Sequence, residues 1–114
     1  MNAKLLERLT RGEKIENYRE PGNSMTPIIK HRDPVTIAPV DIDKLEIGDV
    51  VLAKVRGKFY THLVNAIRGD CIQIANNHGY VNGWTSRRQI YGIVIEVNGH
   101  ALPSALSKVR PAAE

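Results

Sequence analysis

Ser24 and His62 are the residues of this chain whose types and settings best suit chemistry. Ser24 lies in the turn-rich stretch Pro21-Gly22-Asn23-Ser24-Met25-Thr26-Pro27, where prolines restrict the backbone and glycine frees it. A serine hydroxyl becomes a nucleophile when a neighbouring base takes its proton. An imidazole, with an ordinary pKa of about 6.5, is mostly neutral at pH 7 and can accept that proton. Ser24 is therefore a candidate nucleophile and His62 its candidate base, the alternative being a turn serine and a hydrogen-bonded structural histidine.

His62 belongs to one of five expected strands. Branched and aromatic side chains dominate five runs, at residues 35–37, 50–55, 59–67, 72–75 and 90–97. Short glycine-centred loops at 56–58 and 68–70 predict hairpins, so residues 50–75 form an antiparallel meander. Period-2 alternation directs Tyr60, His62 and Val64 to one face, and Thr61 and Leu63 to the other.

The two ends of the chain differ from this β pattern. Leu5, Leu6 and Leu9 share a helical face in residues 2–11, with Asn2 as N-cap and Gly12 as stop. The tail at 99–114 is small, polar and proline-punctuated, which predicts at most one helical turn at Pro103 and fraying. We therefore divide the chain into an N-terminal helical extension at 1–20, a β domain at 21–98 and a C-terminal tail.

Composition limits the class of protein. A chain of 114 residues, 42% of them apolar, suits one globular domain. Residues 1–20 contain no apolar run long enough for a secretory signal or a membrane span. The single cysteine, Cys71, cannot form an internal disulfide and is expected in the core; with no signal or span, this favours a cytoplasmic setting.

Charge and histidine spacing suggest few other sites. Lys and Arg number 16 against 12 Asp and Glu, a modest excess of +4 that is typical of a solvated surface. Basic loops, such as the one at Arg87 and Arg88, leave nucleic acid as an alternative partner. His31 and His78 lack regular metal-ligand spacing with His62, so we expect no metal and no cofactor. Trp84 is expected to be a core or rim aromatic rather than a ligand platform.

A resemblance to a known superfamily covers roughly residues 20–97. Gly22-Asn23-Ser24-Met25-Thr26-Pro27 is similar to the G-x-S-M-x-P box of type I signal peptidases and LexA-like self-cleaving repressors. Two later stretches resemble that superfamily's Gly-Asp-x-Val turns, and another resembles its closing glycine-containing strand after a tryptophan. These stretches are Arg32-Asp33-Pro34-Val35, Ile47-Gly48-Asp49-Val50 and Ile90-Tyr91-Gly92-Ile93-Val94. His62 stands where the bacterial members carry a lysine base, and where the endoplasmic-reticulum and archaeal signal peptidases carry histidine.

The resemblance implies a fold, an activity and partners. The fold would be mainly β, a coiled antiparallel sheet or partly open barrel of the signal-peptidase/LexA C-terminal type, with a short N-terminal helix. The activity would be that of a serine endopeptidase acting on a peptide or protein, with backbone N–H groups at Ser24 and Met25 stabilising the oxyanion. The alternative is a catalytically silent module of the same fold that forms a homodimer or binds protein or nucleic acid.

The chain departs from the superfamily where the histidine needs support. Asn76 and Asn77 stand in place of a box whose acid supports the histidine in the relatives. Losing such a carboxylate in a related triad lowers turnover by about 10⁴. Asp49 and Asp70 are the remaining candidate acids, and Asn77→Asp is expected to raise activity. In addition, Arg32 replaces the glycine of the first Gly-Asp turn, which affects a loop.

Overall fold

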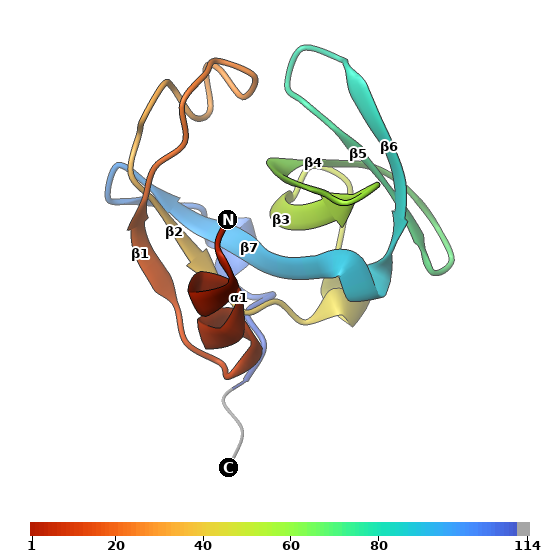
Figure 1. Ribbon diagram of the computed structural model, residues 1–114, viewed down its shortest axis with the longest axis horizontal. Coiled ribbons are helices and arrows are strands. Elements are labelled where there is room, and N and C mark those ends of the chain that lie inside the picture. The colour runs from red at the N-terminus through yellow and green to blue at the C-terminus, as the bar shows by residue number, and fades with distance from the viewer. Residues whose placement is uncertain (112–114) are drawn as a thin grey trace.

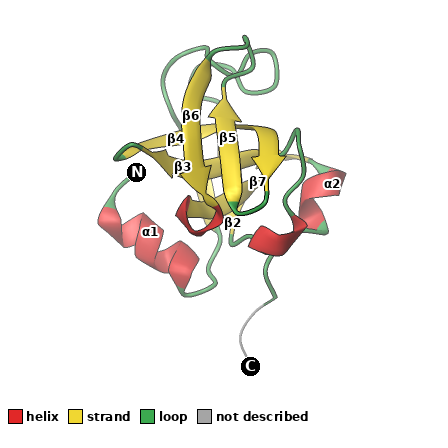
Figure 2. Ribbon diagram, turned by 90° about the vertical axis from the view of Figure 1, so that its right-hand side faces the viewer, coloured by secondary structure: helices red, strands yellow, loops and turns green. Residues whose placement is uncertain are grey.

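The computed structural model describes residues 1–111, which form one antiparallel β-sheet with two short α-helices (Figures 1 and 2). The strands are β1 (Ile15–Tyr18), β2 (Val35–Ala38), β3 (Val50–Val55), β4 (Lys58–Arg68), β5 (Cys71–Ala75), β6 (Val81–Ser86), β7 (Ile90–Val97) and β8 (His100–Ala101). The helices are α1 (Ala3–Thr10) and α2 (Pro103–Leu106), and two 3-10 turns, η1 and η2, cover Ile42–Lys44 and Arg87–Gln89. The expected mainly β, antiparallel class with a short N-terminal helix is therefore confirmed.

The order of strands places β3 and β7 at the centre. Neighbours follow the order β1-β2-β7-β3-β4-β5-β6, and β8 pairs with β7. The three strands β3, β4 and β5 form the expected meander, with Val51 opposite His62 and Leu63 opposite Ala75. On one side of the meander, β7 pairs with β3 and is followed by β2 and β1. On the other side, β6 pairs with β5.

Two apolar clusters occupy opposite faces of the central strands. Val51 and Ala53 of β3 belong to one cluster, whereas Val50 and Leu52 belong to the other. Because successive side chains of a strand point to opposite faces, a continuous apolar run of this kind is buried on both sides. The second cluster also receives Leu9 from α1, so the helix covers that face of the sheet (Figure 1).

Gly92 shows how closely β7 packs on its neighbour. A Cβ at this position would lie 2.6 Å from Ile37 Cγ2 and 3.0 Å from the Ala38 carbonyl oxygen. These distances are shorter than van der Waals contact allows, so only glycine fits here. The glycine of the closing strand is thus a packing requirement of the sheet.

Three strands lie outside the five expected runs. β1, β6 and β8 have polar or very short sequences, since β1 contains Glu16 and Asn17 and β6 contains Asn82. β1 and β6 are the two edges of the sheet, where one side of the strand has no partner and polar side chains are common. Residues 15–18, placed by the sequence in a helical extension, thus join the sheet.

The expected fraying of the C-terminal tail is wrong for residues 99–111. Ala105 and Lys108 are buried, Val109 pairs with Val40, and the Arg110 N–H donates to the Pro39 carbonyl at 2.8 Å. These four residues therefore hold the C-terminal tail against the rest of the domain. The last three residues, 112–114, lie outside the described part of the chain.

The expected core position of Cys71 is also wrong, because Cys71 is exposed. It opens β5 opposite Arg68 of β4 and Ser86 of the edge strand β6. Trp84 lies on the same edge strand, 41% exposed, with the Arg68 guanidinium 5.4 Å from its ring centroid. It is thus a rim aromatic, one of the two positions expected for it.

Within residues 1–111, none of the helices combines the length and apolar character that crossing a bilayer requires.

Candidate active site

Met25 fixes the position of Ser24. The Met25 side chain is 4% exposed and belongs to the apolar cluster that contains Leu9 and Leu52, whereas Ser24 itself is exposed. Two backbone hydrogen bonds shape the turn: Thr26 N–H donates to the Asn23 carbonyl at 3.2 Å, and Ile29 N–H donates to the Met25 carbonyl at 3.0 Å. A buried anchor beside an exposed hydroxyl gives the serine a defined place on the surface.

His62 meets this serine from the middle of the sheet. It lies on β4, 8% exposed, and its Nε2 is 3.1 Å from Ser24 Oγ. On its own strand, Tyr60 packs beside the imidazole with ring centroids 5.1 Å apart. The structure therefore brings Ser24 and His62 within hydrogen-bond distance, as the sequence predicts.

Asn82 contacts the other nitrogen of the imidazole. Its Oδ1 is 2.7 Å from His62 Nδ1, so the amide oxygen accepts the Nδ1–H bond and leaves the Nε2 lone pair directed at Ser24. Ser24, His62 and Asn82 thus form one line of hydrogen bonds. This geometry resembles that of the nucleophile, base and orienting group of a hydrolytic triad, with an amide in the third place.

A β-bulge directs Asn82 toward His62. Ile74 pairs with Gly83 and the next residue, Ala75, pairs with Val81, so Asn82 is an extra residue with no partner opposite it. Gly83 has φ of +140°, a conformation that suits glycine, and a Cβ there would lie 3.2 Å from Val55 Cγ1. Bulges re-aim side chains in this way. The glycine within the run 81–86 is the sequence signal that could have identified Asn82, which our sequence analysis missed.

Asn76 and Asn77, which the sequence suggested as supports for the histidine, bind elsewhere. The Asn76 Oδ1 accepts the N–H groups of His78 and Tyr80, both at 2.9 Å, and so closes the tip of the β5–β6 hairpin. Asn77 donates from its backbone N–H to the Ser24 carbonyl at 2.9 Å and from Nδ2 to the Thr26 carbonyl at 2.8 Å. Asn77 therefore holds the serine loop rather than the imidazole.

Asp49 and Asp70 are likewise not at the imidazole. Asp49 is buried, with Oδ1 2.6 Å from Lys108 Nζ and Oδ2 accepting the Glu46 N–H at 2.8 Å. Asp70 lies in the exposed turn after β4, where its carbonyl accepts the Arg87 N–H at 2.9 Å. The Asp49 carboxylate thus stabilises the turn before β3, whereas Asp70 contributes a backbone hydrogen bond.

Two more histidines surround the serine loop. His31 Nδ1 accepts the Gly22 N–H at 2.8 Å, and His78 Nε2 is 2.9 Å from the Asn23 carbonyl and 3.0 Å from Thr26 Oγ1. Each fastens the loop backbone on one side of Ser24. No group of three or more potential metal ligands occurs among residues 1–111.

Arg32 adopts a backbone conformation that glycine takes more readily than other residues. Its φ of +59° is in the left-handed region, and its N–H donates to the Glu20 carbonyl at 2.9 Å. The next residue, Asp33, accepts the Lys30 N–H at 2.7 Å. The turn at residues 30–33 therefore forms without glycine.

Backbone donors beside Ser24 are available for an oxyanion. Within the described chain, neither the Ser24 N–H nor the Met25 N–H donates a hydrogen bond to another protein group. N–H groups that stay free beside a nucleophile can bind the oxygen that becomes negative during acyl transfer. These are the donors that the resemblance implies.

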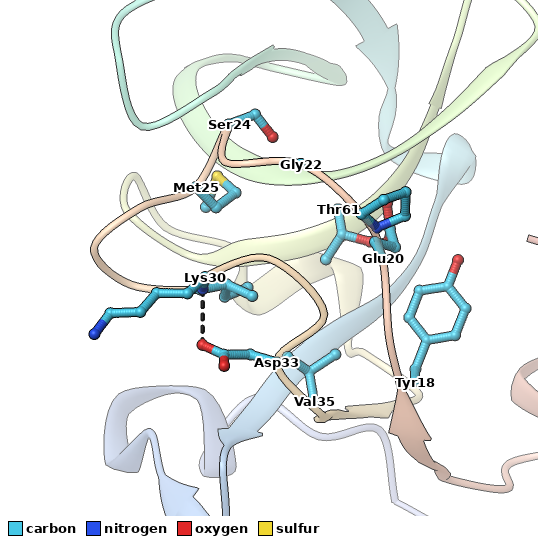
Figure 3. Close-up of a pocket in the computed structure, with 11 residues that line it drawn as sticks. Tyr18, Glu20, Gly22, Ser24, Met25, Lys30, Asp33, Val35 and Thr61 are labelled. Atoms are coloured by element: carbon cyan, nitrogen blue, oxygen red, sulfur yellow. Dashed lines mark hydrogen bonds between the residues drawn. The ribbon is translucent and has the colours of Figure 1, made fainter.

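A pocket begins at Ser24 and extends beneath the loop. It spans about 380 Å³ of space between atoms, a volume that includes open solvent. It is lined by Tyr18, Glu20, Pro21, Gly22, Ser24, Met25, Ile29, Lys30, Asp33, Val35 and Thr61 (Figure 3). Glu20 accepts a hydrogen bond from the Thr61 hydroxyl, which ties the end of the β1 segment to β4. The candidate nucleophile therefore borders a cavity that can hold part of a ligand.

No family model, curated protein or solved structure matches the chain. The choice of Ser24, His62 and Asn82 as site residues therefore depends on their geometry and on the residue pattern.

Proposed function

We propose that the protein is a serine peptidase that uses Ser24 as nucleophile, His62 as general base and Asn82 as orienting residue. The observation that carries the proposal is the continuous hydrogen-bond line, 3.1 Å from Ser24 to His62 and 2.7 Å from His62 to Asn82. The resemblance of residues 22–27 to the serine box of signal peptidases and LexA-like proteins supports the same assignment.

The hydrogen bonds define the direction of proton transfer. Because Asn82 Oδ1 accepts the Nδ1–H bond, His62 Nε2 is free to take the Ser24 proton as Oγ attacks a peptide carbonyl. The carbonyl oxygen becomes negative and is bound by the Ser24 and Met25 N–H groups. His62 then passes the proton to the leaving amine as the C–N bond breaks. A water molecule, activated by the same imidazole, releases the acyl group and restores Ser24.

The edge of β4 beside the site suits an extended chain. β4 pairs with β3 from Lys58 onward, but its pairing with β5 starts only at Leu63. One side of residues 58–62 thus has no strand partner among the described residues, immediately beside His62. Such an edge can bind a peptide by strand addition. This favours a peptide over a small ester as the substrate.

The amide side chain of Asn82 favours a second candidate function, that of a catalytically silent binding module. An amide orients the imidazole but supplies no negative charge to stabilise the imidazolium formed during the reaction. A site with this deficit is expected to react slowly, and a silent module that binds proteins through the same fold is the second candidate. Reactivity of Ser24 discriminates between the two.

Covalent labelling by an alkyl fluorophosphonate tests the proposal. The probe phosphonylates an activated serine and releases fluoride, and intact-mass and peptide mass spectrometry locate the adduct. We expect the adduct on Ser24, with labelling rates reduced about 10³-fold or more in Ser24→Ala and His62→Ala.

His100→Ala is the matched control, because His100 is exposed on β8 away from the site, and its labelling rate should equal that of the unaltered protein. Labelling that is absent in the unaltered chain, or that persists in His62→Ala, would reject the peptidase and support the silent module.

A further inference from the structure

The pocket beneath Ser24 combines apolar walls with a carboxylate. Met25 and Val35, each 4% exposed, and the half-buried Ile29 supply apolar surface between the serine loop and the sheet. Glu20 lies across from them, beside Thr61 (Figure 3). A cavity of this composition can bury an aliphatic chain and receive a polar end group.

Glu20 has no cation to neutralise it. It is half-buried and accepts the Thr61 hydroxyl, but within residues 1–111 it forms no ion pair. Burial, then the neighbouring Glu20 charge and a side-chain hydrogen bond to Glu20, raise the pKa of Tyr18 to about 12, so the phenol beside Glu20 stays neutral. A partly buried charge is stabilised by a partner of opposite sign. The pocket therefore holds a negative charge that the protein itself leaves unbalanced.

The other charges around the pocket do not cancel Glu20. Hydrogen bonding to the Lys30 N–H, and then to Asn98, lowers the pKa of Asp33, which thus remains a carboxylate. The Lys30 ammonium extends away from Glu20 (Figure 3), and Arg19 donates from Nη1 to the Arg32 carbonyl at 3.0 Å. Two carboxylates thus line the cavity. The charges of Lys30 and Arg19 act on Asp33, whereas neither cation forms an ion pair with Glu20 among the described residues.

We propose that this pocket is a substrate subsite that selects a lysine or arginine side chain close to the scissile bond. The methylene stem lies against Met25, Ile29 and Val35, and the cationic head binds Glu20. Long basic side chains bury their stems and keep their charge paired in this way. The inference rests on the proposed function, because it treats the cavity beside Ser24 as part of a peptide-binding site.

Peptide binding to the Ser24→Ala protein tests this selection without requiring cleavage. The probes are acetyl-Ala-Ala-Lys-Ala-Ala-amide and the same peptide with arginine, norleucine or glutamate in place of lysine, compared by isothermal titration calorimetry. We expect the lysine and arginine peptides to bind about tenfold or more tightly than the norleucine peptide, as a charge-assisted hydrogen bond predicts. Raising the ionic strength should reduce the difference in affinity between the basic peptides and the norleucine peptide.

Glu20→Gln in the Ser24→Ala background should remove this preference. Glutamine keeps an oxygen that accepts the Thr61 hydroxyl, so the pocket retains its shape and loses only its charge. Glu16→Gln is the matched control: it removes the same charge from the same segment, but Glu16 does not line the pocket, and the preference should persist.

Equal affinity for the lysine and norleucine peptides, tighter binding of the glutamate peptide, or no binding of any of the peptides would overturn the selection. Fluorophosphonate labelling of Ser24 in the unaltered protein needs no peptide. A labelled Ser24 with no basic preference would reject the subsite alone, whereas unlabelled Ser24 would reject the peptidase.

Discussion

Asn82 is the residue that distinguishes this site from a triad with a carboxylate. Its oxygen holds the His62 tautomer in which Nε2 faces Ser24. Orienting the histidine in this way is one of the two roles of the aspartate in a Ser-His-Asp triad. The other role, stabilisation of the imidazolium, needs a negative charge that an amide lacks. In the proposed mechanism, His62 is therefore oriented to act as a base, but the site lacks the negative charge that would make the reaction fast.

Asn82→Asp places a negative charge beside His62, with the carboxylate oxygen at the same distance from Nδ1 as the amide oxygen that it replaces. We predict that it raises the rate of Ser24 labelling about tenfold or more, because a carboxylate favours the charged imidazole. Asn82→Ala should lower the rate, since the imidazole loses its orienting bond. Rates are measured by mass spectrometry over a time course.

Asn65→Asp is the control for Asn82→Asp. Asn65 is exposed on β4, where its amide donates to Gln73 Oε1 at 2.6 Å, and its replacement should leave the labelling rate unchanged. If Asn82→Asp and Asn82→Ala both label at the rate of the unaltered protein, Asn82 has no part in the chemistry.

The element that supports the site is the β5–β6 hairpin. Its tip holds the serine loop through the two Asn77 bonds to Ser24 and Thr26, while its second strand carries Asn82 to the imidazole. Nucleophile and orienting residue thus depend on one hairpin. A substitution at the tip is therefore expected to shift Ser24, although the substituted residue does not contact His62.

Asn77→Ala is predicted to misplace the nucleophile. The Thr26 carbonyl loses its amide donor, and we expect labelling of Ser24 to slow about tenfold, with a loss of about 1 kcal/mol in the free energy of unfolding. Asn77→Asp should act in the same direction, because a carboxylate would face the Thr26 carbonyl without an N–H to donate. This reverses the expectation from sequence that aspartate at position 77 raises activity.

Tyr80→Ala is the matched change at the same tip. Tyr80 is 67% exposed, and removal of its ring should alter neither the rate nor the stability, as judged by labelling and urea denaturation. A rate for Asn77→Ala equal to that of the unaltered protein would show that the hairpin does not position Ser24.

At the scale of the whole molecule, Lys108 joins the C-terminal segment to the turn before β3. Its Nζ is 2.6 Å from Asp49 Oδ1 and 3.0 Å from Glu46 Oε1, and both Lys108 and Asp49 are buried. The Asp41 N–H in addition donates to the Lys108 carbonyl at 2.8 Å. The tail thus closes the fold at a point remote in sequence from the turn that it stabilises.

Lys108→Met is predicted to lower the free energy of unfolding by about 3 kcal/mol, because it leaves the buried Asp49 charge without its cation. Urea denaturation measures the change. Lys44→Met, at an exposed lysine of η1, is the control and should cost little. A loss in Lys108→Met no larger than in Lys44→Met would show that the pair does not hold the tail.

The same pair predicts a dependence of stability on alkaline pH. Burial lowers the pKa of Lys108, but hydrogen bonds and charges from Asp49 and Glu46 raise it, with a net rise above the ordinary 10.5. The folded state thus binds this proton more tightly than the unfolded state does. The contribution is complete below pH 10.5 and is lost as the pH rises through the folded pKa. Lys108→Met should remove this part of the pH dependence, whereas Lys44→Met should retain it.

Local patterns in the sequence were sufficient for the central strands, the helix α1 and the turn at Ser24, whereas the pairing of Ser24 with His62, 38 positions apart, was expected from the family resemblance. Burial on a strand follows from a two-residue period, and the turn residues around Ser24 restrict the backbone within a few positions. These features depend on interactions between near neighbours in the chain, which a single sequence displays directly.

The partners of the polar side chains were decided only by the tertiary structure. Asn82 reaches His62 because β6 lies two strands from β4 and bulges at that residue, and Asp49 turns to Lys108 because the tail folds back. The unpaired charge of Glu20 depends on where the cations of other segments point. Strand order, register and bulges set these distances, and no local periodicity encodes them.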